Sequence, residues 1–134
     1  MLQRDYILRL FREFTKAIEN ILKERNKKED PEVQQQLQSL YRAYFNHPHT
    51  FYYEQDAEYI LNNLRQSCEG EEFLTRIDML AELMYNDALL QNAAEQKYLL
   101  KKALFLLEYL DSHRDTFSFE RRGKISEIKE KAGK

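Results

Sequence analysis

One stretch of thirteen residues, 98–110 (YLLKKALFLLEYL), limits most strongly how this chain can fold. Ten of the thirteen are apolar, and the only charged side chains are Lys101, Lys102 and Glu108. A helix over this stretch would be apolar on nearly every side, so other elements have to surround it. It is too short and too interrupted to span a bilayer, which needs about 20 predominantly apolar residues. The stretch therefore predicts a central helix covered by other helices of this chain or of a partner.

The composition favours helices throughout. The 134 residues include only two prolines and three glycines, and 33% of them are charged. Leu, Glu, Lys, Gln and Ala are frequent, and these are good helix formers. The length fits one domain that can bury a core without disulfides or metals. We therefore predict an all-α fold that forms a single domain over residues 1–134.

Two features predict a cytoplasmic protein. The single cysteine, Cys68, cannot form a disulfide within the chain. The opening segment MLQRDYILRLFREF mixes charged with apolar residues and so lacks the uninterrupted apolar core of a signal peptide.

The charges are distributed unevenly along the chain. The formal net charge is -2, but residues 1–29 sum to +3, residues 54–95 to -8 and residues 120–134 to +3. This pattern could steer a charged partner or pair two copies of the chain, although solvated helix faces explain it most simply. It provides no continuous basic surface for nucleic-acid phosphates, and we expect neither nucleic acid nor a membrane as a partner.

Periodic apolar positions predict about six helices, joined by short connections and mostly antiparallel to their neighbours. Asp30 followed by Pro31 is typical of a helix start, and Ser118 is a candidate cap for the last helix. Gly70 is expected to end the third helix. Residues 47–53 (HPHTFYY) lack helical rhythm and are predicted to form a tight connection packed by its own aromatic side chains. The predicted helices cover residues 2–27, 31–46, 54–67, 71–90, 93–111 and 118–134.

Residues 80–110 resemble a tetratricopeptide-type helical hairpin. Such hairpins place small residues where two helices cross closely, and Ala81 and Ala103 are the candidates here. The resemblance implies a tetratricopeptide-like hairpin array or bundle.

The whole chain also resembles a family of uncharacterised bacterial proteins that open with a Met-Leu-x-x-Asp-Tyr-Ile segment, matched here by MLQRDYI. Members continue into a long amphipathic helix and finish with tetratricopeptide-like helices and a Ser-x-Glu-Arg segment, matched by Ser118, Glu120 and Arg121. This resemblance implies an all-helical fold but no particular activity or site.

No catalytic, metal or cofactor site is predicted, and we do not expect an enzyme. His47 and His49 flank Pro48 and could share a metal, but no further cysteine or histidine lies near them, so surface loop positions are the preferred interpretation. Cys68 has no partnered base in its sequence neighbourhood and is expected to be a small buried apolar residue. Three scattered glycines cannot build a phosphate-binding loop.

Aromatic residues cluster between positions 41 and 59. Tyrosine is favoured at binding surfaces because it presents a large apolar face with a polar tip. If these side chains are exposed, they would line a groove for a peptide or a second copy of the chain; if they fill the gap between helices, they belong to the core. The candidate partner-binding residues are Tyr41, Tyr44, Phe45, Phe51, Tyr52 and Tyr53.

Two functional hypotheses follow. The first is a non-enzymatic helical interaction or scaffold module that binds a protein segment or itself, with a homodimer formed through the first helix. The second is a bundle that encloses a pocket for a small apolar or aromatic ligand among its second to fifth helices. Whether the first helix fills the concave face of the array is left open at this stage.

Overall fold

The computed structural model describes residues 2–23, 31–114 and 118–132, and within these ranges it contains seven helices and no strand. The predicted all-α fold is therefore confirmed. The helices are α1 (Leu2–Leu22), α2 (Pro31–Phe45), α3 (His49–Glu54), α4 (Ala57–Ser67), α5 (Gly70–Ala88), α6 (Ala93–His113) and α7 (Phe119–Ala132).

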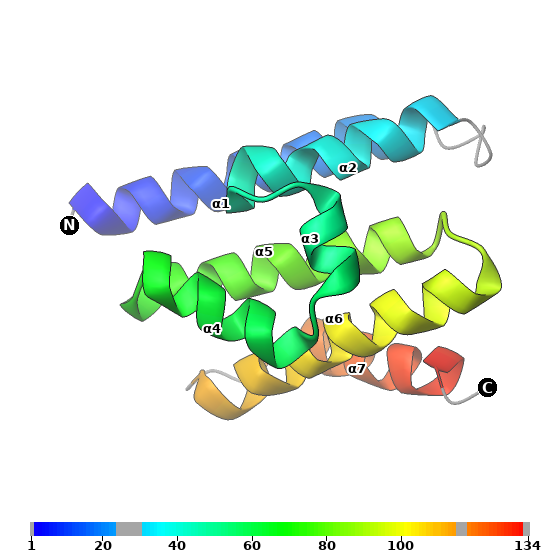
Figure 1. Ribbon diagram of the computed structural model, residues 1–134. Coiled ribbons are helices and arrows are strands. Elements are labelled where there is room, and N and C mark those ends of the chain that lie inside the picture. The colour runs from blue at the N-terminus through cyan, green and yellow to red at the C-terminus, as the bar shows by residue number, and fades with distance from the viewer. Residues whose placement is uncertain (1, 24–30, 115–117, 133–134) are drawn as a thin grey trace.

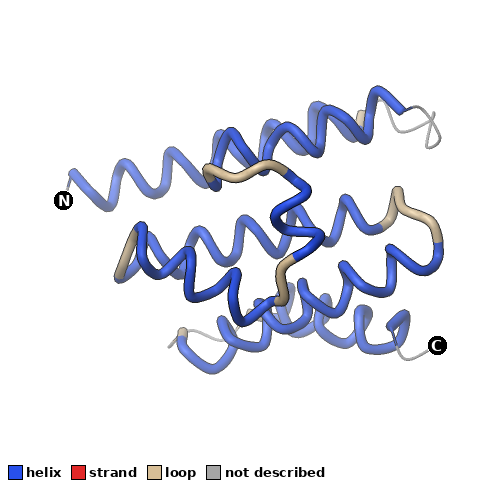
Figure 2. Tube along the Cα trace, viewed as in Figure 1, coloured by secondary structure: helices blue, strands red, loops and turns tan. Residues whose placement is uncertain are grey.

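α5 and α6 make the most extensive contact of any two helices and form the centre of the bundle. α1 and α2 pack against each other and against α5, α4 packs against both α5 and α6, and α7 packs against α6 (Figure 1). The short helix α3 leads the chain across the bundle from α2 to α4, and Figure 2 shows brief connections on both sides of it. The first helix thus packs against α2 and α5.

The stretch at residues 98–110 lies in α6 and is surrounded as predicted, since α6 packs against α4, α5 and α7. α5 is buried even more completely, with eleven buried residues among its nineteen against seven among the twenty-one of α6. Ala81 of α5 and Ala103 of α6 are both fully buried. Within the part of the chain that is described, no helix is long and apolar enough to cross a membrane.

The prediction that residues 47–53 form a non-helical connection is wrong, because α3 begins at His49. Pro48 adopts an extended conformation before α3, and its carbonyl accepts the hydrogen bond of the Phe51 amide at 3.0 Å. Six residues are too few to display an apolar repeat of 3.6, which explains why the pattern gave no sign of a helix. The predicted packing by local aromatics is confirmed: the rings of His47 and Phe51 stack with their centres 4.0 Å apart.

Most predicted helix ends lie within a few residues of the observed ones. Ser118 caps α7 as predicted, since its Oγ accepts a hydrogen bond from the Arg121 amide. α4 begins at Ala57 rather than at residue 54, because the Asp56 side chain accepts a hydrogen bond from the Tyr59 amide and so caps the helix there.

Two predictions about the connection between α4 and α5 need correction. Gly70 has a φ of 65°, but it is the first residue of α5 rather than the end of the preceding helix. Cys68 follows the last residue of α4 and is half-buried rather than fully buried. Burial still raises the pKa of its thiol. The positive φ of Gly70 lets the chain turn sharply between the two helices.

At the other end of the molecule, α2 begins at Pro31 as predicted. The proposed cap Asp30 and the predicted extension of the first helix over residues 24–27 lie outside the described residues.

Candidate functional site

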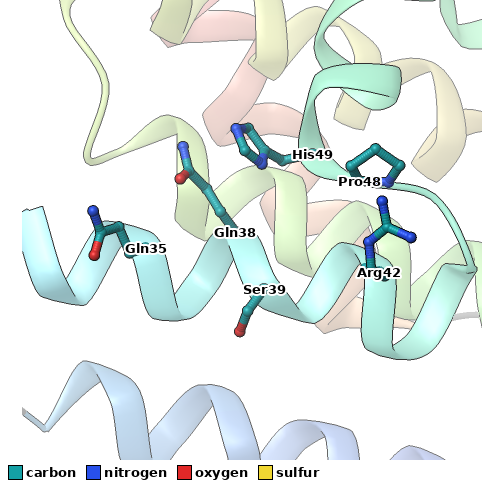
Figure 3. Close-up of a pocket in the computed structure, with 6 residues that line it drawn as sticks. All are labelled: Gln35, Gln38, Ser39, Arg42, Pro48 and His49. Atoms are coloured by element: carbon teal, nitrogen blue, oxygen red, sulfur yellow. The ribbon is translucent and has the colours of Figure 1, made fainter.

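A surface pocket of about 340 Å³ lies between α2 and the start of α3. In Figure 3 the side chains of Gln38 and Arg42 rise from α2 toward His49 and Pro48. Gln35, Ser39 and Arg42 are exposed, so the pocket opens to solvent along α2. We call this site the α2–α3 pocket, and its lining residues are Gln35, Gln38, Ser39, Arg42, Pro48 and His49.

The helical repeat of α2 explains one wall of the pocket. Gln35, Gln38 and Arg42 are spaced by three and four residues, which places their side chains on one face of the helix. The opposite face is buried in the bundle through Val33, Leu37 and Tyr41.

Backbone conformation supplies the other wall. Asn46 has a φ of 74°, and it turns the chain back at the end of α2. Pro48 is extended and starts α3, so that Pro48 and His49 return to face the side chains of α2 (Figure 3). Asparagine tolerates this left-handed conformation better than most residues with a side chain.

The side chains that line the pocket carry several polar groups and one positive charge, although most of the surface that they expose to it is apolar carbon. Among the described residues, Arg42 is the one permanently charged lining residue and no aspartate or glutamate lines the pocket. The carboxamides of Gln35 and Gln38 can each donate and accept hydrogen bonds. A carboxylate or a peptide group can pair with these polar groups, and the apolar surface beside them can contact an aliphatic part of the same ligand.

Beneath the pocket, a chain of hydrogen bonds leads from Gln38 into the core. Gln38 Nε2 donates to the Tyr53 hydroxyl at 3.1 Å, and this hydroxyl donates to Asp87 Oδ2 at 2.7 Å. Asp87 is fully buried in α5. The floor of the pocket is thus tied to a buried carboxylate by two hydrogen bonds in series.

Asp87 has two further donors. The Tyr41 hydroxyl donates to Oδ2 at 2.7 Å, and Gln91 Nε2 donates to Oδ1 at 3.0 Å. Gln91 Nε2 also donates to the Tyr53 hydroxyl at 3.0 Å. We call these five residues the Asp87 network: Gln38, Tyr41, Tyr53, Asp87 and Gln91.

Burial dominates the titration of this network. It raises the pKa of the Asp87 carboxyl, although the hydrogen bonds from Tyr53, Tyr41 and Gln91 partly oppose the shift. Burial and the neighbouring carboxylate also raise the pKa of the Tyr41 and Tyr53 hydroxyls well above the ordinary value. Both tyrosines therefore keep their protons and serve as donors at physiological pH.

Lys102 holds α3 from the side of α6. Its Nζ donates to the backbone carbonyls of Tyr52 at 2.9 Å and of Tyr53 at 2.7 Å. These carbonyls belong to the last turn of α3, where the helix dipole favours a cation. Burial lowers the pKa of the Lys102 ammonium group. The Tyr53 side chain therefore ties α3 to α5, and the Lys102 side chain ties the backbone of α3 to α6. These contacts hold α3 in place and so position Pro48 and His49 at the pocket.

The six predicted partner-binding residues lie in α2 and α3, three in each helix. Tyr41, Phe45 and Tyr52 are buried, and the rings of Tyr41 and Tyr52 stack with centres 5.1 Å apart. The Tyr52 hydroxyl donates to the Phe45 carbonyl at 2.8 Å. Tyr44, Phe51 and Tyr53 are half-buried. Contact with a partner stays a prediction for all six, and only the half-buried three keep accessible side-chain surface.

Both histidines were predicted to be surface loop residues; His47 does lie in the connection between α2 and α3, whereas His49 belongs to α3. His47 is half-buried, with its Nε2 3.1 Å from Asn63 Oδ1, and His49 begins α3 with its ring against that of Tyr53. In the ranges that the structure describes, no group of three or more His, Cys, Asp or Glu side chains could hold a metal ion.

Sequence reasoning missed Asp87, Lys102 and the glutamines of α2. A signal existed for the first two, because Asp87 lies among the inward-facing positions of the helix at residues 71–90 and Lys102 lies inside the most apolar stretch. Charged residues at such positions are almost never buried without partners.

Asp87 is separated from the pocket by its own hydrogen-bond partners. Asp87 is enclosed, and both of its oxygens accept hydrogen bonds within the protein, so it cannot exchange protons with a molecule in the pocket without rearrangement. The pocket residue Ser39 is also engaged within the protein, since its hydroxyl donates to the Gln36 carbonyl at 2.7 Å.

Comparisons with protein-family models, with curated proteins and with solved structures found no match.

Proposed function

We propose that this chain is a non-enzymatic interaction module that binds a protein segment through the α2–α3 pocket. The observation that carries the proposal is an open pocket whose polar groups include the guanidinium of Arg42 and whose residue Gln38 is bonded to the Asp87 network. A segment with an aspartate, a glutamate or a terminal carboxylate would pair with Arg42, while the carboxamides of Gln35 and Gln38 would bind its backbone.

Rigidity supports this proposal because a preformed site spends less free energy on ordering its side chains when it binds. Gln38 is already held by the Tyr53 hydroxyl, and α3 is held by Lys102. The half-buried ring of Tyr53, which lies against the pocket residue His49, offers additional contact area there.

A small apolar ligand is the less favoured alternative. The stacked rings of Tyr41 and Tyr52 occupy the space between α2 and α3, and both side chains are buried. An apolar ligand at this place would have to displace them.

The proposed scaffold is a tetratricopeptide-like hairpin of α5 and α6, onto which α1 to α3 are packed. We further propose that the module acts in the cytoplasm, on the basis of its single cysteine.

The proposal can be tested by NMR titration of the labelled protein with an acetylated, amidated peptide of alternating glycine and glutamate. A peptide in which glutamine replaces glutamate serves as the probe without carboxylates. We expect the glutamate peptide to shift the amide signals of Gln38, Arg42 and His49, and Arg42→Glu to abolish those shifts.

The matched control is Arg9→Glu, which makes the same charge change at an exposed position on α1. If Arg9→Glu weakens binding as much as Arg42→Glu does, the attraction is a property of net charge rather than of the pocket. That result, or equal shifts with both peptides, contradicts the proposed recognition of a carboxylate.

A further inference from the structure

α1 has a second stripe of side chains beside the one that it buries. Its buried stripe comprises Ile7, Phe14 and Ile18. The second stripe is spaced by four, three, four and four residues, which keeps it on one side of a helix with 3.6 residues per turn. Its members are Arg4, Leu8, Phe11, Thr15 and Glu19.

The apolar centre of this stripe faces solvent. Leu8 is 51% exposed and Phe11 is 38% exposed. α1 reaches past the end of α2 in Figure 1, and the ring of Phe14 already packs against Tyr44 and Phe45 in the last turn of α2. The turns of α1 that precede Phe14 therefore extend beyond the cover that α2 provides.

Tyr6, which is also exposed, lies on the opposite edge of α1 and is engaged within the chain. Arg76 Nη2 is 3.4 Å from its hydroxyl. Leu8 lies about 160° around the helix from Tyr6, since successive residues are separated by about 100°. The exposed stripe is thus separate from the edge at which α1 meets Arg76.

The charges at the two ends of the stripe are complementary under twofold symmetry. When two copies of α1 lie antiparallel with the axis between Phe11 and Arg12, paired positions sum to 23. Arg4 then faces Glu19 of the partner subunit, and Glu19 faces Arg4 of the partner subunit. The two Phe11 side chains meet near the axis, and each Leu8 faces Thr15 of the partner subunit.

A parallel arrangement would place arginine opposite arginine and glutamate opposite glutamate, which is unfavourable. Among the described residues, neither Arg4 nor Glu19 forms an ion pair within its own chain. We infer that the stripe docks a second copy of this chain through an antiparallel pairing of α1 with α1, held by two symmetric Arg4–Glu19 ion pairs around a Phe11–Leu8 centre.

The interface is small, so its affinity is modest. Stable complexes bury about 1,200–2,000 Å² in total, and a single pair of helices provides less than that. We expect a dissociation constant of about 0.1–1 mM, and stronger association at low ionic strength because exposed ion pairs are screened by salt. This surface is distinct from the α2–α3 pocket, so either proposal can fail without the other.

Charge reversal at the two ends tests the pairing by sedimentation equilibrium over about 0.05–1 mM protein at low salt. Arg4→Glu alone and Glu19→Arg alone each place like charges opposite one another at both ends, and should weaken self-association about tenfold. The double variant Arg4→Glu/Glu19→Arg restores opposite charges and should dimerise like the original chain. An equimolar mixture of the two single variants should also associate, because each supplies the charge that the other lacks.

Local unfolding would not explain weakening by these substitutions. Glutamate in the first turn and arginine in the last turn both favour the helix dipole, so each single variant should keep its helix content. Self-association that is unaffected by the single variants, or is not restored in the double variant, overturns the antiparallel pairing.

The apolar centre has its own matched pair of variants. Phe11→Gln should abolish association, whereas Phe105→Gln should leave it unchanged, because Phe105 of α6 is 39% exposed and outside the stripe. A mass near 16.3 kDa for the original chain at every concentration overturns the inference. Equal sensitivity to both phenylalanine substitutions would also overturn it, since the contact would then not be specific to α1.

Discussion

Replacing Tyr53 by Phe removes one hydroxyl from the Asp87 network and leaves the ring in place. That hydroxyl donates to Asp87 Oδ2 at 2.7 Å and accepts from Gln38 at 3.1 Å and from Gln91 at 3.0 Å. The bond to the carboxylate dominates the loss, because a hydrogen bond to a charged group contributes about 1.5–3 kcal/mol. Gln38 and Gln91 are half-buried, so water can replace much of what they lose.

In this variant Asp87 keeps the Tyr41 hydroxyl and Gln91 Nε2 as donors, so each carboxylate oxygen still accepts a hydrogen bond. We therefore expect Tyr53→Phe to lower the free energy of unfolding by about 2 kcal/mol in the pH range in which Asp87 is ionised. For a chain of this size this loss corresponds to a decrease in Tm of roughly 6–10 °C. When Asp87 is protonated at low pH, the loss should fall to about 1 kcal/mol, because the bond is then between neutral groups.

Urea unfolding followed by circular dichroism at 222 nm measures this change, and the denaturant slope should stay constant. The matched control is Tyr44→Phe, since Tyr44 is also half-buried and its hydroxyl has no hydrogen bond within the described ranges. Its effect should be below about 0.5 kcal/mol. A loss of the same size in both variants would refute the conclusion that the hydrogen bond from the Tyr53 hydroxyl to Asp87 stabilises the fold.

Two further predictions concern the helices that meet at the centre of the bundle. The folded state raises the pKa of Asp87 above its ordinary value of 3.8, so the stability that this group contributes is complete below 3.8 and is lost as pH rises through the raised pKa. The difference in unfolding free energy between the original chain and Asp87→Asn should therefore decrease with rising pH in urea titrations, and an increase would show that hydrogen bonding outweighs burial. Ala103→Phe should cost about 1–3 kcal/mol by overpacking, since Ala103 is fully buried in α6; a change near zero in thermal unfolding would place the close crossing of α5 and α6 elsewhere.

Much of the fold was predictable because its signals are local. The 3.6-residue repeat needs only the positions within one helix, and it located α1, α2 and α5 to within a few residues of their observed starts. Ser118 was also identified from its neighbourhood, since a cap acts within three residues of itself.

α3 shows where local patterns fail. A helix of six residues is shorter than two turns and cannot display an apolar repeat. Its stability comes from elsewhere in the chain, through the Tyr53 hydroxyl on Asp87 and the Lys102 ammonium on its last carbonyls. These contacts span 34 to 50 residues of sequence.

The aromatic cluster was visible in the sequence, but its division into buried and half-buried rings was not. Tyr41 is fully buried because its hydroxyl meets Asp87, 46 residues away, whereas Tyr44 lies one helical turn further on and keeps partial exposure. The candidate site shows the same contrast. The polar face of α2 was available from spacing alone, but only the turn at Asn46 brings His49 over it.

Composition and helical periodicity predict an all-helical chain built around an apolar stretch that has to be covered, because these signals act over a few residues. The burial of α5, the enclosure of Asp87 and Lys102, and the pocket between α2 and α3 follow only from the packing of distant segments. The physical reason is that burying a charged side chain is favourable only when distant donors and acceptors meet it, and only the folded chain brings those groups together.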